Sequence, residues 1–378
     1  MKEPLLNLFV VACLLGEFAP LRAQTSPDIL WQTNGVSGYY PSAVAVSSDS
    51  RFVVSGWNDG NIKVWNATNS NLVRGLGIPT NPRSVALSSD GSTVAAGEGG
   101  GKTRLWQVSD GARLWIGGPD DGVVYAVPFS PDDSLIALGR TDGINLRYSE
   151  NGNGIFFGEP PSSVFSLCFS PEGQWLASAN EDFNASLWRV PEGTLVHNFV
   201  GHSNAVTSVD FAPDGLLLAT ASADGTARVW DATTGESLLV LEGGGGIAKF
   251  SANGSLLFTL GDGTFKIWRV SSGSCIGSIT NTGALCFDIA KNGKYFTYGR
   301  GDGALVLART PVVLDKIIRT GNQTILAWQG GSGRYRLQSR TNLLSGSWEN
   351  VGGTTTNVTV TNISSATLFF RVQSLPIP

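Results

Sequence analysis

The sequence predicts an all-β protein in which a ring of seven repeated units is followed by a small antiparallel β-sandwich. Three observations support this fold class. The 378 residues include 48 glycines, which is typical of a chain with many tight turns. Short runs of alternating apolar and polar residues, as in half-buried strands, recur along the chain. A pattern with a period of about forty residues, the spacing of repeat architectures, returns seven times.

Two landmarks define the repeat. The first is a seven-residue segment such as DGNIKVW, whose last residues are Trp65, Trp106, Tyr148, Trp188, Trp230, Trp268 and Ala308. The second is a turn such as SPDD or APDG, whose third residues are Asp49, Asp90, Asp132, Glu172, Asp214, Asn253 and Asn292. Each unit is expected to form about four short strands, and neighbouring units bury the faces that one unit leaves open. The sequence therefore predicts a seven-bladed β-propeller over residues 24–310.

The fifth unit has the fullest set of polar residues. It runs from Gly201-His202 through Asp224-Gly225 to Trp230-Asp231, and on these residues the chain resembles the WD40 repeat family across roughly residues 28 to 310. The resemblance implies a buried hydrogen-bonded tetrad, which maps onto His202, Thr220, Asp224 and Trp230. The first and fourth units keep part of the tetrad, at Ser55, Asp59 and Trp65 and at Ser178, Asp182 and Trp188, and the other units keep less.

A propeller must also close its ring. Pro311 follows the third strand of the seventh unit, where a fourth strand would be needed. Residues 28–33 (DILWQT) resemble the fourth strand of the second unit around Trp115. We therefore expect residues 28–33 to complete the last blade and join it to the first.

The period stops after Pro311. Short β-like runs separated by glycine, serine and threonine predict a small antiparallel sandwich over residues 311–378. Tyr335–Gln338, Trp348 and Phe370–Gln373 resemble the fibronectin-III-like C-terminal modules of secreted bacterial proteins. That resemblance implies a tethering, spacing or adhesive role for the tail.

The first residues are typical of a secretory signal. Lys2 precedes the apolar run Leu5–Leu15, and Ala23 precedes a cleavage point at Gln24, so residues 1–23 are a predicted signal peptide. The run is too short to span a bilayer, and no membrane span is predicted elsewhere. We expect a secreted protein, or one held in the periplasm or at the cell surface. VVAC, ending at Cys13, also resembles a lipoprotein cleavage box, which leaves lipid anchoring at Cys13 as an alternative.

Cleavage would leave an odd number of cysteines, Cys168, Cys275 and Cys286. An odd count argues against a dense disulfide framework, so packing is expected to hold the fold. Cys168 in SLCF and Cys286 in ALCF are expected at equivalent strand positions, as small buried hydrophobes.

The sequence contains little that predicts catalysis. The two histidines, His197 and His202, have no cysteine or carboxylate at ligand spacing, so no metal and no cofactor is predicted. GxSxG, P-loop and HExxH motifs are absent from the sequence. Asp-Gly pairs fit hairpin turns better than calcium loops. The carboxylate pairs Asp120-Asp121 and Asp132-Asp133 could imitate a glycosidase, but solvated loops explain them better.

These observations favour a binding scaffold over an enzyme. The alternative is an extracellular propeller enzyme that acts on polysaccharide or lactone. The expected partner is a protein or peptide, with a cell-surface glycan as a further candidate. A net charge of -4 offers no basic footprint for nucleic acid.

The family resemblance also implies where binding would occur. Partners of WD40 propellers most often meet the face formed by the loops entering the first strands and the loops between second and third strands. The residues projected onto that face are Tyr40, Trp57, Arg83, Tyr125, Arg140, Phe165, Glu181 and Arg300. Aromatic residues and arginine are favoured at interface centres. Tyr125 and Phe165 could instead belong to the core between blades, and this alternative stays open.

Overall fold

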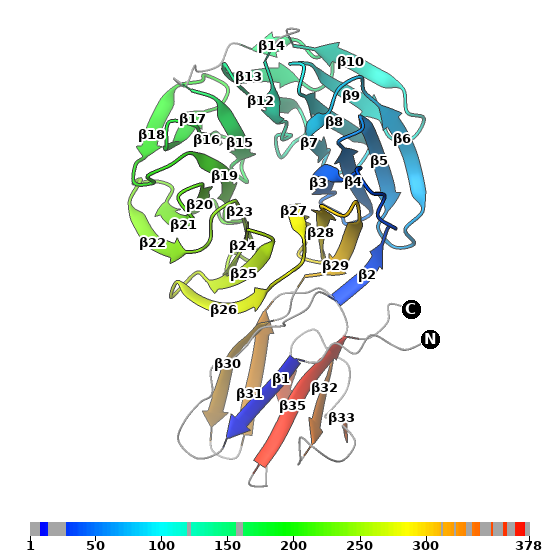
Figure 1. Cartoon of the computed structure of the whole chain (residues 1–378). Helices are drawn as coiled ribbons and strands as arrows, with labels where there is room; N and C mark the ends of the chain where they lie inside the picture. The colour runs from blue at the N-terminus through cyan, green and yellow to red at the C-terminus, as the bar shows by residue number, and fades with distance from the viewer. Residues whose placement is uncertain are drawn as a thin grey trace.

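Seven four-stranded antiparallel sheets form a ring, with the first strand of each sheet innermost (Figure 1). This computed structural model describes residues 28–310 except 119–121 and 156–161, together with the backbone of seven strands outside that range. The seven-bladed, all-β propeller expected from the two landmarks is confirmed. No helix long and apolar enough to cross a membrane occurs among the described residues.

Each blade is an up-and-down sheet in chain order. Blades one to four contain, in turn, β3 (Pro41–Val46), β4 (Phe52–Trp57), β5 (Asn61–Asn66), β6 (Leu72–Gly77); β7 (Pro82–Leu87), β8 (Thr93–Glu98), β9 (Thr103–Gln107), β10 (Arg113–Gly117); β11 (Val124–Ala126), β12 (Leu135–Arg140), β13 (Gly143–Tyr148), β14 (Gly154–Ile155); β15 (Val164–Phe169), β16 (Trp175–Asn180), β17 (Ala185–Arg189), β18 (Leu195–Phe199). Blades five to seven contain β19 (Val206–Phe211), β20 (Leu217–Ser222), β21 (Thr226–Asp231), β22 (Ser237–Glu242); β23 (Ile247–Phe250), β24 (Leu256–Gly261), β25 (Thr264–Arg269), β26 (Ser274–Ile279); β27 (Ala284–Ile289), β28 (Tyr295–Arg300), β29 (Leu305–Arg309).

The fourth strand of blade seven comes from the start of the described chain. β2 (Asp28–Gln32) pairs antiparallel with β29. Beyond the strand, the Thr33 N–H donates to the Leu305 carbonyl and the Leu305 N–H donates to the Thr33 hydroxyl, both at 2.9 Å. The Trp31 indole donates to the Ala67 carbonyl at 2.9 Å, and its ring centroid lies 6.3 Å from that of Trp65. One segment therefore ties blade seven to blade one.

A β-bulge marks the start of the inner strand in six blades. The register shifts between residues one and three of β3, β7, β11, β15, β19 and β27. A bulge places two residues opposite one and turns the extra side chain away from the ladder. The second residues of these strands, Ser42, Arg83, Tyr125, Phe165, Thr207 and Leu285, thus share one position around the ring. β23 pairs without a shift.

Tryptophans at the ends of third strands fill the gaps between blades. Trp106 packs among residues of blade one and Trp268 among residues of blade five. Buried indole N–H groups need an acceptor. In blades one, four and six that acceptor is a second-strand hydroxyl, as in the 2.9 Å bonds Trp188–Ser178 and Trp268–Thr259. The sixth blade therefore keeps more of the repeat's polar pairing than the sequence suggested.

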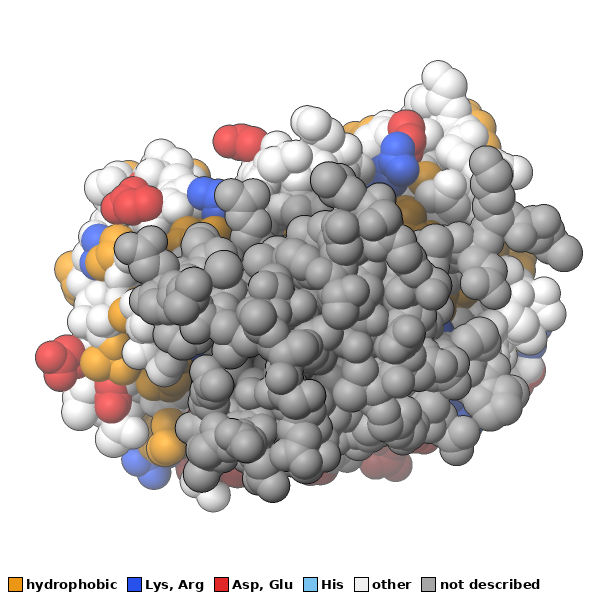
Figure 2. Space-filling view, turned by 90° about the horizontal axis from the view of Figure 1, so that it is seen from below, with side chains coloured by type: hydrophobic (Ala, Val, Ile, Leu, Met, Phe, Trp, Pro, Cys, Tyr) orange, Lys and Arg blue, Asp and Glu red, His pale blue; other side chains and the backbone are white. Residues whose placement is uncertain are grey.

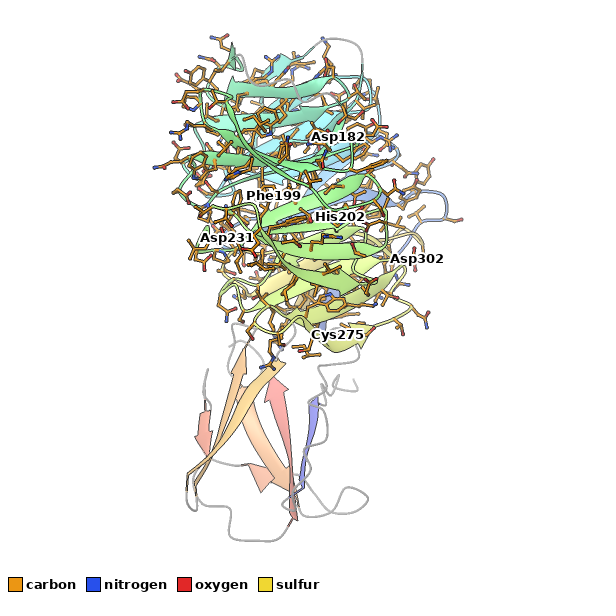
Figure 3. The ribbon with its side chains drawn as sticks, turned by 90° about the vertical axis from the view of Figure 1, so that its left-hand side faces the viewer. Asp182, Phe199, His202, Asp231, Cys275 and Asp302 are labelled. Carbon is orange, nitrogen blue, oxygen red and sulfur yellow. The ribbon has the colours of Figure 1, made fainter. Side chains whose placement is uncertain are left out.

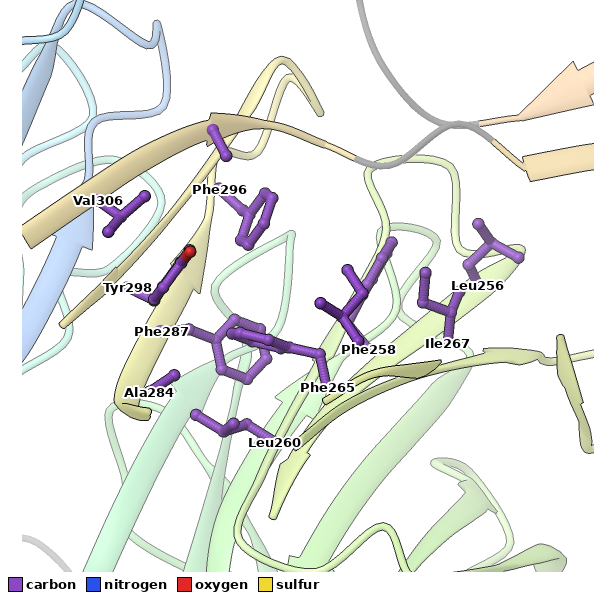
Figure 4. Packing of buried hydrophobic residues seen from close by; sticks show 12 residues of the cluster. Leu256, Phe258, Leu260, Phe265, Ile267, Ala284, Phe287, Phe296, Tyr298 and Val306 are labelled. Carbon is purple, nitrogen blue, oxygen red and sulfur yellow. The ribbon is translucent and has the colours of Figure 1, made fainter. Parts of the chain in front are cut away.

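Blades three and seven replace this tryptophan in different ways. Tyr148 is 48% exposed, and Trp115 enters the core between blades two and three instead, where its indole donates to the Ser149 carbonyl at 2.7 Å. Blade seven has Ala308, and an aromatic cluster fills the space beside blade six (Figure 4). Its Phe265 and Phe287 rings meet edge to face with centroids 5.1 Å apart, a favoured aromatic geometry.

The expectation that Cys168 and Cys286 occupy equivalent positions is wrong. Cys168 pairs with Ala177, whereas Cys286 pairs with Gly299 beside the bulge. SLCF and ALCF look alike, but a residue's position in these strands is set by its distance from the following turn. Measured in this way, Cys286 lies two residues earlier in its strand than Cys168. Cys286 is buried, Cys168 is partly buried, and the three described cysteines are not in disulfides.

Two further sheets are described by their backbone alone. One contains β1 (Leu8–Cys13), β35 (Thr367–Ser374), β32 (Tyr335–Arg340) and β33 (Glu349–Asn350), and the other contains β30 (Val313–Thr320), β31 (Gln323–Gln329) and β34 (Val358–Val360). Their pairings are antiparallel. The side chains and connecting segments of residues 311–378 lie outside the described residues, so the fibronectin-III-like sandwich stays a prediction. So does the signal peptide, whose cleavage would remove β1.

Candidate binding face

The turns between second and third strands project from one face of the ring, which we call the front face. In the edge-on view of Figure 3, Asp182 and Asp302 in two of these turns lie toward the right-hand side. Asp231, at the end of a third strand, lies toward the opposite side. The loops that lead into the inner strands open on the front face too, because successive antiparallel strands alternate in direction.

The six bulge residues form the rim of the central channel on the front face. Ser42 and Thr207 are engaged within the fold, since their hydroxyls donate to the next blade at Pro82 (2.7 Å) and Gly246 (2.6 Å). Leu285 is 52% exposed.

The structure brings three of the sequence-predicted residues together on this rim. Arg83 is exposed, while Tyr125 and Phe165 are partly buried. The Tyr125 and Phe165 rings meet edge to face across blades three and four, with centroids 5.2 Å apart. The two aromatic residues therefore belong both to the packing between blades and to the surface.

Two other candidates are buried and hold the fold rather than offer contact surface. Trp57 is 4% exposed, and its indole donates to the Ser55 hydroxyl at 2.9 Å. Arg140 is 1% exposed and donates to the Gly101 carbonyl of blade two at 3.0 Å and to Asp142 at 2.7 Å. Both lie at the last position of a second strand, directly opposite the first residue of the bulge, where side chains turn into the gap between blades.

The remaining candidates are spread around the front face. Tyr40 is partly buried, and its N–H donates to the Asn58 side chain at 2.9 Å. Glu181 is exposed, and Arg300 is partly exposed and paired with Asp302. Contact between any of the eight candidates and a ligand stays a prediction.

The blade-five tetrad forms a continuous hydrogen-bonded chain. His202 Nδ1 lies 2.8 Å from Asp224 Oδ2, and His202 Nε2 lies 2.8 Å from Thr220 Oγ1. The Trp230 indole donates to the same hydroxyl at 2.9 Å. Because an indole N–H can only donate, the Thr220 hydroxyl gives its own proton to Nε2, and the imidazole proton sits on Nδ1 facing Asp224. Each polar group in this buried chain is thereby satisfied.

The surroundings move both tetrad pKa values down. Burial lowers the pKa of His202, and the Asp224 carboxylate only partly opposes this. Burial alone would raise the pKa of Asp224, but hydrogen bonds from the Ser203 N–H, from Thr226 and from His202 outweigh it and hold that pKa well below its usual range. His202 is therefore neutral, and Asp224 ionised, in the folded protein at neutral pH.

We expect acid to destabilise the protein through His202. Its folded pKa lies below the unfolded value of about 6.5, so the unfolded chain binds the proton first as the pH falls. The free energy of unfolding should decrease between about pH 7 and pH 5.5. A His202→Gln variant, although less stable at pH 7, should show a flatter pH dependence in urea unfolding. Equal slopes for the two proteins would contradict this account.

Sequence reasoning missed a charged cluster on the innermost strands. Cys168, Asp210, Lys249 and Asp288 occupy one position on four successive inner strands, as their pairing partners Ala177, Ala219, Phe258 and Thr297 show. Counting back from the following turn would have aligned them, at the place where blades one to three have Ala45, Ala86 and Pro128.

This cluster joins neighbouring blades. Asp210 accepts the Phe250 N–H of blade six at 2.8 Å, and Asp288 accepts the Val46 N–H of blade one at 3.0 Å. Lys249 Nζ lies 3.5 Å from Asp210 Oδ1. A buried carboxylate is stable only when it is paired and hydrogen-bonded. These contacts indicate that the cluster has a structural role and links the inner strands of neighbouring blades.

The pKa values in the cluster fit this structural role. Burial would lower the pKa of Lys249, but the Asp210 and Asp288 carboxylates outweigh it and raise that pKa. Burial raises the pKa of Asp288, and Lys249 opposes the change. Burial and Asp210 raise the pKa of Cys168 to about 11, so its thiol is protonated at neutral pH and is a poor nucleophile. Among the described residues, no three His, Cys, Asp or Glu side chains gather as a metal site would require.

Charges of both signs are mixed on the visible surface. In the space-filling view from below, both acidic and basic side chains are visible around the described edge of the molecule (Figure 2). Two acidic side chains in the turns between second and third strands, Asp142 and Asp302, are 62% and 53% exposed.

A known protein-family model matches four segments of the repeat region. Four segments match the family described as "WD domain, G-beta repeat", at residues 33–66, 154–189, 193–231 and 236–269. The third of these contains the whole tetrad. The chain therefore contains WD40 repeats.

Several curated proteins share part of this sequence. The chain is 36% identical over 78 residues to "Small ribosomal subunit protein RACK1z" of Oryza sativa subsp. japonica, covering 20% of this chain and 23% of that protein. It is 27% identical over 174 residues to "Protein groucho" of Drosophila melanogaster, covering 41% and 21%. It is 23% identical over 181 residues to human "Transducin-like enhancer protein 6", covering 42% and 28%. The matches thus span only 21% to 28% of the length of these relatives.

Proposed function

We propose that this WD40-repeat propeller is a non-catalytic scaffold that binds a protein or peptide at the channel rim on its front face. One observation carries the proposal. Three successive blades present Arg83, Tyr125 and Phe165 from the same bulge position, and the two aromatic rings are held in place by contact with each other. Partly buried aromatic side chains that are already ordered lose little entropy on binding, and arginine adds directional hydrogen bonds.

The relatives support a role that depends on contacts. RACK1z is named as a protein of the small ribosomal subunit. A propeller with few candidate catalytic side chains and a broad face suits such a role, because its loops supply contact area on a rigid ring.

The proposal includes export of the protein. Lys2, the apolar run Leu5–Leu15 and Ala23 support a signal peptide that is removed before Gln24. The C-terminal module would then act as a spacer or a second adhesive unit. Mass spectrometry of the mature protein tests this, since an N-terminus at Gln24 is expected and a lipid-modified Cys13 or an uncleaved chain would overturn it.

The binding role predicts specific losses at the rim. Peptides selected from a random phage-displayed library against the mature chain should bind the front face, and Tyr125→Ala or Phe165→Ala should weaken them at least about tenfold, as hot-spot residues do. Arg83→Ala should weaken them too, without affecting folding, because Arg83 is exposed. Fluorescence polarisation with the labelled peptides measures the dissociation constants.

Tyr148→Ala is the matched control, since it removes an exposed tyrosine away from the rim. Peptides that bind all three rim variants as tightly as the original chain would overturn the proposed site. Turnover of a polysaccharide or lactone without any peptide binding would favour the enzyme alternative instead.

A further inference from the structure

The second-to-third-strand turn of blade four differs from its six counterparts. Each of the other turns contains a glycine in the left-handed region, with φ between 68° and 130°, at Gly60, Gly101, Gly143, Gly225, Gly263 and Gly303. Blade four has Phe183 in this turn, at φ 73°. The sequence already showed the exception, as DFN where most other units have DG.

Phe183 is also unusual among the left-handed residues that are not glycine. The others in the described part of the chain are serine, aspartate or asparagine, whose short polar side chains tolerate this backbone region. A phenylalanine there is strained, and the residue is 46% exposed, so burial does not explain its presence. Strained backbone at an exposed site is commonly retained where the side chain contacts a ligand.

Two carboxylates, Glu181 and Asp182, directly precede Phe183 in sequence. Glu181 is exposed, and its backbone N–H donates to the Ser163 carbonyl at 2.9 Å. Asp182 accepts the Asn184 N–H at 3.1 Å, which shapes the turn, and Figure 3 places it toward the front face. Within the described residues, no cation lies within ion-pair distance of either carboxylate. The turn thus offers an exposed aromatic side chain within two residues of two carboxylates that have no ion-pair partner among the described residues.

We propose that this turn binds a lysine or arginine side chain of the protein partner, with the cation over the Phe183 ring and paired with the Glu181 carboxylate. A cation is attracted both by the face of an aromatic ring and by a carboxylate, and the two attractions add when the groups are adjacent. Blade one contains the same kind of contact within the chain, since Lys63 Nζ lies 4.3 Å from the Trp57 ring centroid. The inference rests on the binding role proposed for the front face and names the chemistry of its partner.

The test uses the mature chain and random phage-displayed peptides as the probe. The selected peptides should be enriched in lysine or arginine. Phe183→Gly should weaken the best synthetic peptide at least about tenfold, and Glu181→Gln should weaken it about threefold and reduce its salt dependence. Replacing the peptide's key arginine with citrulline should produce a similar loss, with little further loss on Phe183→Gly, because both changes remove one interaction.

Stability measurements separate a binding role from a structural one. Phe183→Gly gives blade four the residue found in the other turns, so its thermal midpoint should stay the same or rise. A lower midpoint would show that Phe183 supports the fold and would overturn the proposal. Tyr39→Ala is the control, because Tyr39 is a similarly exposed aromatic residue (49%) in the loop that enters blade one, and its loss should leave binding unchanged.

The outcomes also distinguish this inference from the broader function. Peptides that lose affinity with Tyr125→Ala but bind Phe183→Gly and Glu181→Gln normally would overturn the inference and leave the scaffold function standing. Selected peptides without lysine or arginine would do the same. If no peptide binds the original chain at all, the proposed function fails, and this inference fails with it.

Discussion

Replacing Trp230 with alanine is expected to lower the free energy of unfolding by about 3–5 kcal/mol, the cost of deleting a large buried aromatic side chain. Trp230 is 1% exposed and packs in the core between blades four and five, with its ring 5.7 Å from that of Phe199. Its indole N–H also donates a hydrogen bond to the Thr220 hydroxyl. The variant therefore leaves a cavity between two blades and removes one donor from the tetrad.

Urea unfolding of Trp230→Ala, Trp230→Phe and Tyr148→Ala tests this expectation. Trp230→Phe keeps much of the packing but loses the hydrogen bond, so a smaller loss is expected, of which the bond accounts for about 1 kcal/mol. Tyr148→Ala changes the equivalent position of blade three, where the side chain is 48% exposed, and should cost less than about 0.5 kcal/mol. Similar losses for Trp230→Ala and Tyr148→Ala would show that the core between blades four and five does not depend on the indole.

A chain that begins after residue 36 is expected to lose cooperative unfolding, with a thermal midpoint lower by more than about 10 °C. Removal of β2 leaves the outer edge of β29 without a partner, although β29 still pairs with β28, and opens the ring. It also removes Trp31, which contacts blade one through Ala67 and Trp65. The loss therefore acts on two blades at once.

Calorimetry of four samples tests the closure. The chain that begins at Gln24 is the control and should melt like the full-length protein. Adding a synthetic peptide of residues 24–36 to the shortened chain should raise its midpoint, because the peptide can restore the pairing in trans. If the shortened chain melts like the full-length protein, ring closure does not depend on β2.

Much of the fold could be predicted because its requirements are local and recur. A tight turn needs glycine or a small polar residue, and a gap between blades needs a large aromatic residue. Both landmarks therefore repeat with the blades and count seven of them. Residues 28–33 could be predicted as a fourth strand for a similar reason. A strand's pattern of exposed and buried residues is set by its place in the sheet, so this segment resembles the fourth strands of other blades.

The candidate site could be predicted only in part. The sequence predicts both Arg83 and Trp57 on the front face, yet Arg83 is exposed and Trp57 is buried. The difference is the bulge, because one extra residue in the inner strand decides which side chain turns outward. Strand positions predicted from the sequence are uncertain by about one residue, so they cannot reveal the one-residue shift that a bulge introduces.

The sequence alone determined the repeat and the number of blades, and its resemblance to WD40 repeats implied the residues of the blade-five tetrad. Only the tertiary structure decided which residues from different blades meet. Tyr125 and Phe165 touch, and Asp210 lies beside Lys249, although each pair is about forty residues apart. The physical reason is that contacts within a blade follow from neighbouring turns, whereas contacts between blades depend on the bulges and on how closely the sheets pack around the channel.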